Sequence, residues 1–218
     1  MYILILAYST CFLYDGVSEN GRQTDRVMQM AEKTYFVAVP LPPAMKHALY
    51  EWTMRARGAD AFRKWVYEED YHITLKYLGA CDDALLQAVR DQLVAIPGLA
   101  PFRLRLSGIG YFGRREAPRI LWAGVDGELK RLHELQAQVE QAMTAVGFEA
   151  ENRPYRPHVT IAKNFQGTHF AMDRWTSRWS EEMGSQPAWT ADSIVLYRTD
   201  LGSKPMYQVE GVYPLRNK

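Results

Sequence analysis

Hydrophobic and polar positions alternate in several short stretches of the 218-residue chain. In Phe102–Ser107, three apolar residues alternate with two arginines and a serine, which is typical of a β-strand with one buried face. Thr34–Val39 is rich in β-branched and aromatic residues and also predicts a strand. The same reasoning predicts strands at 71–78, 119–125, 193–198 and 206–213, with a second motif strand beginning near His158.

Between these strands, apolar residues recur at helical spacing in four stretches. The first opens at Pro42-Pro43 and stops at Gly58, because proline is tolerated in a first helical turn and glycine is favoured after the last one. Four apolar stripes define the predicted helices: Met45, Leu49, Trp52 and Ala56; Leu85, Val89, Leu93 and Ile96; Leu129, Leu132, Leu135, Val139, Met143 and Val146; and Trp175, Trp179 and Met183.

The order of these elements is a rough repeat, in which strand, helix, motif strand and helix occur twice. No glycine-rich phosphate loop opens a helix, so a dinucleotide-binding parallel sheet is not indicated. The sequence predicts an α+β protein with two pseudo-symmetric lobes of mixed or antiparallel sheet, flanking helices and a shared cleft.

The two motif strands carry the most informative pattern in the chain. His72-Ile73-Thr74-Leu75 recurs in kind, 86 residues later, as His158-Val159-Thr160-Ile161. Because side chains alternate along a strand, each copy buries its two aliphatic residues and offers an imidazole and a hydroxyl on the other face. The alternative is that both histidines are half-buried residues hydrogen-bonded by neighbouring threonines, with no chemical role.

Composition sets limits on what the protein binds. The 26 basic and 25 acidic residues nearly cancel, so contact with a polyanion has to come from a local patch. Two cysteines, Cys11 and Cys81, suggest no disulfide framework and favour the cytoplasm. They lack metal-ligand spacing, so neither a metal nor another cofactor is expected.

Residues 1–32 differ from the rest of the chain and are interpreted as an accessory or poorly ordered extension of a two-lobed domain at 33–218. The apolar run at 2–8 is too short to span a bilayer. It also lacks the basic start of a signal peptide, so no membrane association is expected. Met28 or Met30 is a candidate functional start, because the first predicted core strand follows directly.

Several segments resemble the two-histidine phosphoesterase superfamily, and most of all its RNA 2′,3′-cyclic phosphodiesterase branch, formerly called 2′-5′ RNA ligases. The similarity rests on HITLKYLG at 72–79, RPHVTIAKN at 156–164, the preceding WVYEEDY, GYFGRREAPRILWAGV at 110–125 and the final IVLYRTDLGSKPMYQV. It runs from about Thr34 to Leu215. One departure is Lys163, where many relatives carry arginine; lysine keeps the charge but loses the planar fork that holds phosphate bidentately.

The resemblance implies hydrolysis of an RNA 2′,3′-cyclic end to a 2′-phosphate, with a weak reverse ligation, and it makes His72 the proton donor and His158 the acceptor. Two histidines suit this chemistry because an imidazole exchanges protons near neutral pH. The threonine hydroxyls of Thr74 and Thr160 are expected to hydrogen-bond the non-bridging phosphate oxygens, and Lys163 to add an electrostatic contact.

Two further residues are candidates for substrate binding. Gly108–Gly113 is interpreted as a glycine-aromatic turn region, and Arg114, which follows it, as a nucleotide contact. Tyr155, just before the second motif, is a candidate for stacking on a base. The tryptophans Trp65, Trp122, Trp175 and Trp179 are interpreted as core residues rather than as platforms for a ligand.

Other functions fit the same residues. The substrate could be a 2′-5′-linked oligonucleotide, ADP-ribose cyclic phosphate or another small cyclic nucleotide in place of an RNA 3′ end. The protein could instead be an RNA-binding module without turnover, or a metallohydrolase that uses the two histidines as ligands. No carboxylate lies within either tetrapeptide, which weighs against the metal. A monomer is expected.

Overall fold

The computed structural model describes residues 33–96, 99–184 and 188–216. The interpretation of residues 1–32 as an extension, and of Met28 or Met30 as a start, concerns residues outside this described part. Nine strands, four α-helices and a short 3₁₀ helix follow in the order β1 (Thr34–Pro40), α1 (Pro43–Ala56), β2 (Phe62–Trp65), η1 (Glu68–Asp70), β3 (His72–Ala80), α2 (Asp83–Ala95), β4 (Phe102–Arg114), β5 (Ala117–Gly127), α3 (Leu129–Ala145), β6 (His158–Phe165), α4 (Met172–Glu182), β7 (Trp189–Ala191), β8 (Ser193–Thr199) and β9 (Tyr207–Pro214).

The strands form one sheet in the order β7-β4-β5-β6-β3-β1-β8-β9, and β2 pairs with β6 off this path. Every pairing is antiparallel, which resolves the predicted choice between a mixed and an antiparallel sheet. The motif strands β3 and β6 lie next to each other at the centre. They share a single register pair, Ile73 with Val159, and β2 takes over beside β6 at Ala162–Phe165. Each half of the sheet therefore contributes one motif strand, as the repeat predicted.

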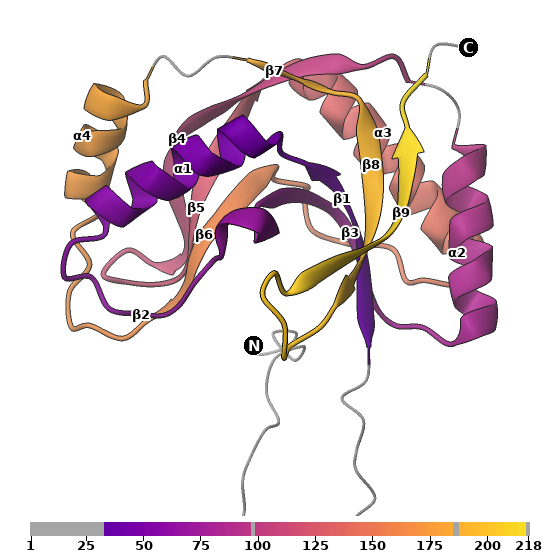
Figure 1. Cartoon of the computed structure of the whole chain (residues 1–218), viewed down its shortest axis with the longest axis horizontal. Coiled ribbons are helices and arrows are strands. Elements are labelled where there is room, and N and C mark those ends of the chain that lie inside the picture. The colour runs from indigo at the N-terminus through magenta and orange to yellow at the C-terminus, as the bar shows by residue number, and fades with distance from the viewer. Residues whose placement is uncertain (1–32, 97–98, 185–187, 217–218) are drawn as a thin grey trace, which may run out of the picture. The chain divides into compact units, whose positions relative to one another are not determined.

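The helices connect the two halves. α1 follows β1 in the chain, yet it contacts α4, which packs against β4 (Figure 1). Conversely, α3 follows β5 and packs against β3 and α2 on the other half. Each half is thus covered by a helix whose preceding strand belongs to the opposite half. Within the described residues, no helix is both long and apolar enough to cross a membrane.

Burial follows the predicted alternation. The first five residues of β3 and of β6 have the same sequence of partly buried and buried positions, so that His and Thr lie on one face while Ile73, Leu75, Val159 and Ile161 are buried on the other. The helices contribute their apolar stripes to this main core, including Leu49, Val89, Leu132, Leu135 and Trp175. In α2 the buried stripe holds Leu86 rather than the predicted Leu85, because the helix begins at Asp83 with Asp82 as its N-cap.

The predicted turn at Gly108–Gly113 is wrong. β4 continues through this segment to Arg114 and pairs with β5 from Leu104 to Arg114. Gly108 has a φ of +54° and sits at a register shift, which a residue without a side chain accommodates easily. Gly110 lies under the ring of Trp122, where a Cβ atom would come within 2.1 Å of that ring. These glycines serve a bulge and a close approach within a strand, which sequence patterns alone easily confuse with a turn.

Candidate active site

The two motif histidines are held in the same way. Nδ1 of His72 lies 2.7 Å from the carbonyl oxygen of Asp70, and Nδ1 of His158 lies 2.7 Å from that of Arg156. A carbonyl oxygen only accepts, so both Nδ1 atoms carry the proton and donate. In the neutral imidazole, each Nε2 is then left with a lone pair. Both rings are therefore fixed in the tautomer that presents a basic Nε2.

The register of the central strands brings these groups together. Continuing the Ile73–Val159 pairing by one residue in each direction places His72 beside Thr160 and Thr74 beside His158. The two histidines are then diagonal neighbours on one face, with Cα atoms about 7–8 Å apart in a regular ladder. The two copies of the motif therefore lie side by side on the central strands of the sheet.

Thr74 also contacts its own histidine. Its hydroxyl lies 3.0 Å from Nε2 of His72, and it donates to that atom when the imidazole is neutral. Thr160 is partly buried and pairs with Trp122 of β5. Both hydroxyls lie on the histidine face of the sheet, so they are placed where the sequence predicted them.

Aromatic rings from neighbouring strands surround each histidine. Centroids of Phe36, Tyr207 and Tyr197 lie 4.7, 5.1 and 6.0 Å from the ring of His72. On the other half, Phe112 lies 5.0 Å and Trp122 6.0 Å from the ring of His158. These rings shield the two imidazoles from solvent. Sequence analysis did not identify them, because no local pattern links residues on five different strands.

Burial controls the protonation of both histidines. It lowers the pKa of His72 from 6.5 to about 3, and the nearby charges of Lys163 and Lys46 act in the same direction, against the hydrogen bond to Asp70. Burial also lowers the pKa of His158, opposed by its hydrogen bond to Arg156 and assisted by Lys163. In the free protein both imidazoles are therefore neutral at pH 7. A bound anion favours the protonated form and raises both pKa values.

Three lysines gather around this site from separate elements. Lys163 of β6 pairs with Lys64 of β2, and Lys46 of α1 donates to the carbonyl oxygen of Glu69, at 2.5 Å, just before His72. Burial lowers the pKa of all three, and the charge of Asp70 partly restores each one. Sequence analysis identified Lys163 but missed Lys46 and Lys64, whose proximity arises only when α1 and β2 fold against the centre of the sheet.

Asp70 is the buried counter-charge of this group. Its side chain accepts hydrogen bonds from the backbone N–H groups of Met206 and Tyr207, at 3.1 and 3.0 Å, and so ties η1 to the start of β9. Its own carbonyl oxygen orients His72. One residue therefore positions an imidazole and balances the lysines, and only its place two residues before His72 could have drawn attention to it.

The remaining predicted residues lie at the edges. Tyr155 is partly buried; its hydroxyl donates to the carbonyl oxygen of Thr74 at 3.1 Å and its ring contacts His133 at 5.5 Å. Burial raises its pKa. Arg114 is exposed at the end of β4, beside the two-residue turn of the β4–β5 hairpin, rather than in a longer loop. Of the four tryptophans, Trp175 and Trp179 are buried as predicted. Trp65 is partly exposed but packs against the core, whereas Trp122 is partly exposed and lies beside His158.

No group of three or more His, Cys, Asp or Glu side chains is arranged to hold a metal ion within residues 33–96, 99–184 and 188–216. Cys81 is a free thiol, whereas Cys11 lies outside these ranges.

The fold and the site define an α+β protein with an antiparallel sheet, in which two adjacent central strands present one imidazole each on the same face. Residues 42–203 match the family model of the 2′-5′ RNA ligase superfamily, and the chain belongs to this family. The chain is 38% identical over 191 residues to a protein of Geobacillus stearothermophilus named RNA 2′,3′-cyclic phosphodiesterase, with 85% of the chain and 58% of that relative covered. It is 31% identical to one of Bacillus subtilis with the same name, with 80% and 92% covered.

Solved structures agree on the fold. The crystal structure of TT0787 of Thermus thermophilus has a TM-score of 0.66 and 27% identity, with 85% of this chain and 99% of that chain covered. The structure of E. coli LigT complexed with 3′-AMP has a TM-score of 0.68 at 20% identity, with the same coverage. The second likeness shows the fold alone.

Proposed function

We propose that this protein hydrolyses RNA 2′,3′-cyclic phosphate ends to 2′-phosphomonoesters, and that His72 and His158 act as general acid and general base without a metal. The observation that carries the proposal is the shared arrangement of the two histidines: each Nδ1 is fixed by a backbone carbonyl, and each Nε2 is on the same face of adjacent strands. The relatives named RNA 2′,3′-cyclic phosphodiesterase support the choice of substrate.

The reaction needs one proton taken and one given. One Nε2 accepts a proton from water as its oxygen attacks phosphorus, and the other, protonated, Nε2 gives a proton to the leaving 3′ oxygen on the opposite side. Because burial keeps both imidazoles neutral in the free protein, the acid has to gain its proton when the anionic substrate arrives. The resemblance assigns the acid to His72 and the base to His158. After each turnover the proton moves back by way of solvent.

Charge on the phosphate is held by the groups around the histidines. Thr74 and Thr160 donate to its non-bridging oxygens, and Lys163 stabilises the negative charge that builds up in the transition state. Lys46 and Lys64 add to the positive potential at the same place. Arg114, at the tip of the β4–β5 hairpin, contacts the nucleotide from the His158 side.

A related substrate is the second candidate. The same two histidines suit a 2′-5′-linked oligonucleotide or another small cyclic nucleotide. E. coli LigT, whose fold is similar, has been crystallised with 3′-AMP, ATP and NADP⁺. Comparing hydrolysis rates on these candidates with the rate on a 2′,3′-cyclic-phosphate oligonucleotide separates them.

The decisive experiment is incubation of the purified protein, in EDTA, with an oligonucleotide ending in a 2′,3′-cyclic phosphate, with the 2′- and 3′-monophosphate products resolved. We expect a 2′-phosphate, and loss of activity in His72→Ala and His158→Ala. His169→Ala is the matched control, because that histidine is exposed and lies outside both motif strands. Activity that disappears in EDTA and returns with a metal would point to a metallohydrolase. Binding of RNA without hydrolysis would point to a binding module.

A further inference from the structure

A cavity of about 260 Å³ lies between α1, β2, η1 and the segment that joins β8 to β9. We infer that it binds the nucleotide that precedes the cyclic-phosphate end in an RNA chain. The inference rests on the proposed function and adds to it a preference for oligonucleotides over mononucleotides. Its walls include Arg57, Lys64, Trp65, Tyr67, Asp70 and Lys204.

Two residues link the cavity with the candidate active site. Lys64 lines it and is also the register partner of Lys163, which acts on both histidines. Asp70 lines it and also orients His72 through its carbonyl oxygen. A ligand whose terminal phosphate lies at the histidines therefore reaches the cavity with the next group along its chain.

The cavity carries more positive than negative charge, because Arg57, Lys64 and Lys204 line it together with the one carboxylate of Asp70. Within the described residues, Arg57, Lys64 and Lys204 form no ion pair with a carboxylate. The nearby arginines Arg55 and Arg174, in contrast, are paired with Glu182 and Asp60. Lys64 donates to the sulfur of Met206 at 2.9 Å, and a thioether is a weak acceptor for an ammonium group. An anionic group such as a phosphodiester matches these three side chains.

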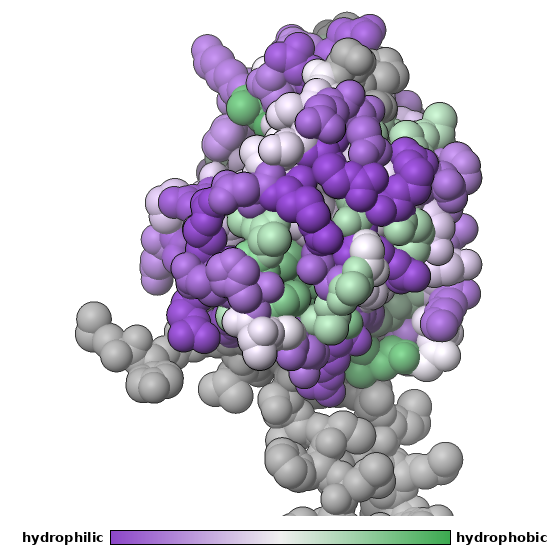
Figure 2. Space-filling model, turned by 90° about the vertical axis from the view of Figure 1, so that its left-hand side faces the viewer, coloured by the Kyte–Doolittle hydropathy of each residue, from purple (hydrophilic) through white to green (hydrophobic). Residues whose placement is uncertain are grey.

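Aromatic surface lies beside this charge. Tyr67 is 40% exposed, and Trp65 is partly exposed with the guanidinium of Arg57 5.8 Å from its ring centroid. Single-stranded nucleic acids are bound by this combination of aromatic faces, on which bases stack, and cations, which contact the backbone. Figure 2 shows that the side of the protein bearing α1, α4 and β2 is otherwise mainly hydrophilic, with apolar residues in small patches.

The cavity is too small to enclose a large ligand. At about 260 Å³ it is somewhat smaller than the range of roughly 300–1,000 Å³ typical of sites for drug-sized ligands. The net charge of the whole chain is only +1, so a local group of cations is the way in which it can bind a polyanion. A short contact with the last internucleotide phosphate and its base satisfies both conditions.

The test compares two substrates with the same terminal nucleoside: a nucleoside 2′,3′-cyclic phosphate and a trinucleotide ending in that group. We expect Tyr67→Ala to lower kcat/KM for the trinucleotide about tenfold, because one base loses its stacking partner, and to leave the mononucleotide unchanged. Lys204→Ala is expected to lower the trinucleotide rate and to reduce the slope of log kcat/KM against log salt by about 0.7.

Two variants are matched controls. Tyr77→Ala removes a tyrosine of similar exposure, 42%, from β3, and Lys130→Ala removes an exposed lysine from α3. Neither residue lines the cavity, and both variants are expected to treat the two substrates as the parent does. Equal losses on both substrates would overturn the inference, because the cavity would then hold the terminal nucleoside itself. Effects of Tyr77→Ala as large as those of Tyr67→Ala would also overturn it.

A binding measurement keeps the inference separate from the proposed function. Fluorescence anisotropy with a 5′-labelled trinucleotide ending in a 2′-phosphate reports affinity without any turnover. If the parent hydrolyses neither substrate, the proposed function fails, and weaker RNA binding by Tyr67→Ala still supports the cavity as a nucleotide site. Equal affinities of parent and variant, or no binding by either, would overturn it.

Discussion

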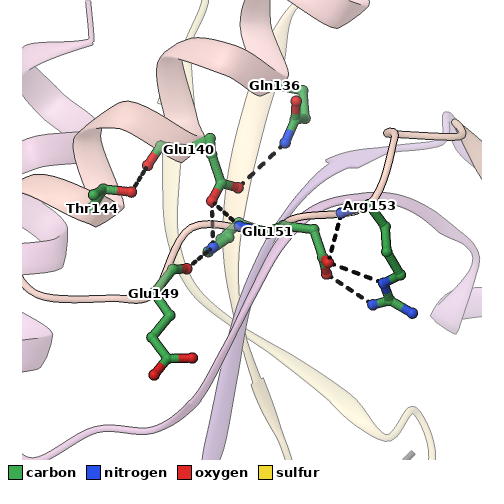
Figure 3. Close-up of polar contacts among 7 residues, drawn as sticks. Gln136, Glu140, Thr144, Glu149, Glu151 and Arg153 are labelled. Carbon is green, nitrogen blue, oxygen red and sulfur yellow. Dashed lines mark hydrogen bonds and ion pairs between the residues drawn. The ribbon is translucent and has the colours of Figure 1, made fainter. Parts of the chain in front are cut away.

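Lys76 of β3 and Glu140 of α3 form an ion pair, with Nζ 2.5 Å from Oε1, and the lysine side chain is only 8% exposed. Lys76 also donates to the carbonyl oxygen of Glu149 at 2.6 Å, and Glu140 accepts from the backbone N–H of Glu151 at 2.9 Å (Figure 3). The strand that carries His72 thereby holds the segment that leads to the second motif histidine.

Breaking this ion pair on one side should be costly. We expect Lys76→Met to lower the free energy of unfolding by about 3–5 kcal/mol, because it leaves Glu140 without its buried partner. The double variant Lys76→Met, Glu140→Met should lose less than the two single variants together. Urea unfolding measures all three.

The exposed pair of Arg105 and Asp126 is the control, and Arg105→Ala should lower the free energy of unfolding by less than about 1 kcal/mol. A similar cost for both lysine and arginine variants would contradict this expectation.

The roles of the two histidines can be separated by the leaving group. A nucleotide p-nitrophenyl phosphodiester needs no proton on departure, so the variant that lacks the general acid should recover most of its activity on it. If His72 is the acid, as the resemblance implies, the loss of kcat/KM in His72→Ala should be about 10²–10⁴-fold smaller on the p-nitrophenyl ester than on a 2′,3′-cyclic phosphate. The loss in His158→Ala should be similar on both substrates. Steady-state rates on both substrates decide this. Recovery in His158→Ala instead would reverse the assignment.

Anion binding should be accompanied by proton uptake. Both histidines have lowered pKa values in the free protein, and a bound anion raises them. Sulfate is a suitable probe because its own charge is constant between pH 5 and 8. Calorimetry of sulfate binding at pH 7, in two buffers of different ionisation enthalpy, should show net uptake that falls in His72→Asn. Binding without proton uptake in the parent would contradict the proposed protonation of the acid when the anion binds.

The same shift predicts how stability depends on pH. Between about 3, the pKa of His72 in the folded protein, and its ordinary value of 6.5, the unfolded chain binds a proton at this residue that the folded protein does not. The contribution of neutral His72 to the free energy of unfolding is therefore fully present above pH 6.5. It is lost as the pH falls through this window, at about 1.4 kcal/mol per pH unit. Urea unfolding at pH 7 and pH 4.5 should show a larger loss for the parent than for His72→Asn. Equal losses would rule out this contribution.

Gly110 controls the position of Trp122. A Cβ atom at this residue would come within 2.1 Å of the indole, which lies 6.0 Å from the ring of His158. Gly110→Ala should therefore displace the indole, lower kcat/KM and lower the free energy of unfolding by about 1–3 kcal/mol. Gly147→Ala is the control: its φ is +101° but the added atom meets nothing within 4 Å, so only stability should fall. Unchanged kcat/KM in Gly110→Ala would show that the indole does not influence His158.

The sequence patterns correctly predicted which face of a strand or helix is buried. Alternation along β3 and β6 gave the burial of Ile73 and Val159 and the shared face of the histidines, because the side-chain period of a strand is independent of its partners. The helical stripe of α3 was likewise correct at Leu132, Leu135 and Val139.

Contacts between distant segments could not be predicted in this way. Phe36 and Tyr207 reach His72 only because β1 and β9 belong to the same half of the sheet as β3. Lys64 lies on a four-residue strand too short to produce a periodic pattern. The lysine's role depends on β2 pairing with β6, nearly one hundred positions later in the chain, a choice that tertiary packing makes.

The matching burial of the two motif strands gives the centre of the sheet an approximate twofold axis through Ile73 and Val159. A small tetrahedral anion on that axis would face one imidazole and one threonine hydroxyl from each of the two strands. Under the proposed function, the choice of which ester oxygen departs must arise from what breaks this equivalence: Lys46 and two tyrosines near His72, and an indole and a phenyl group near His158. The regiochemistry of the proposed reaction is then set by the neighbours of the repeated tetrapeptides and not by the tetrapeptides themselves.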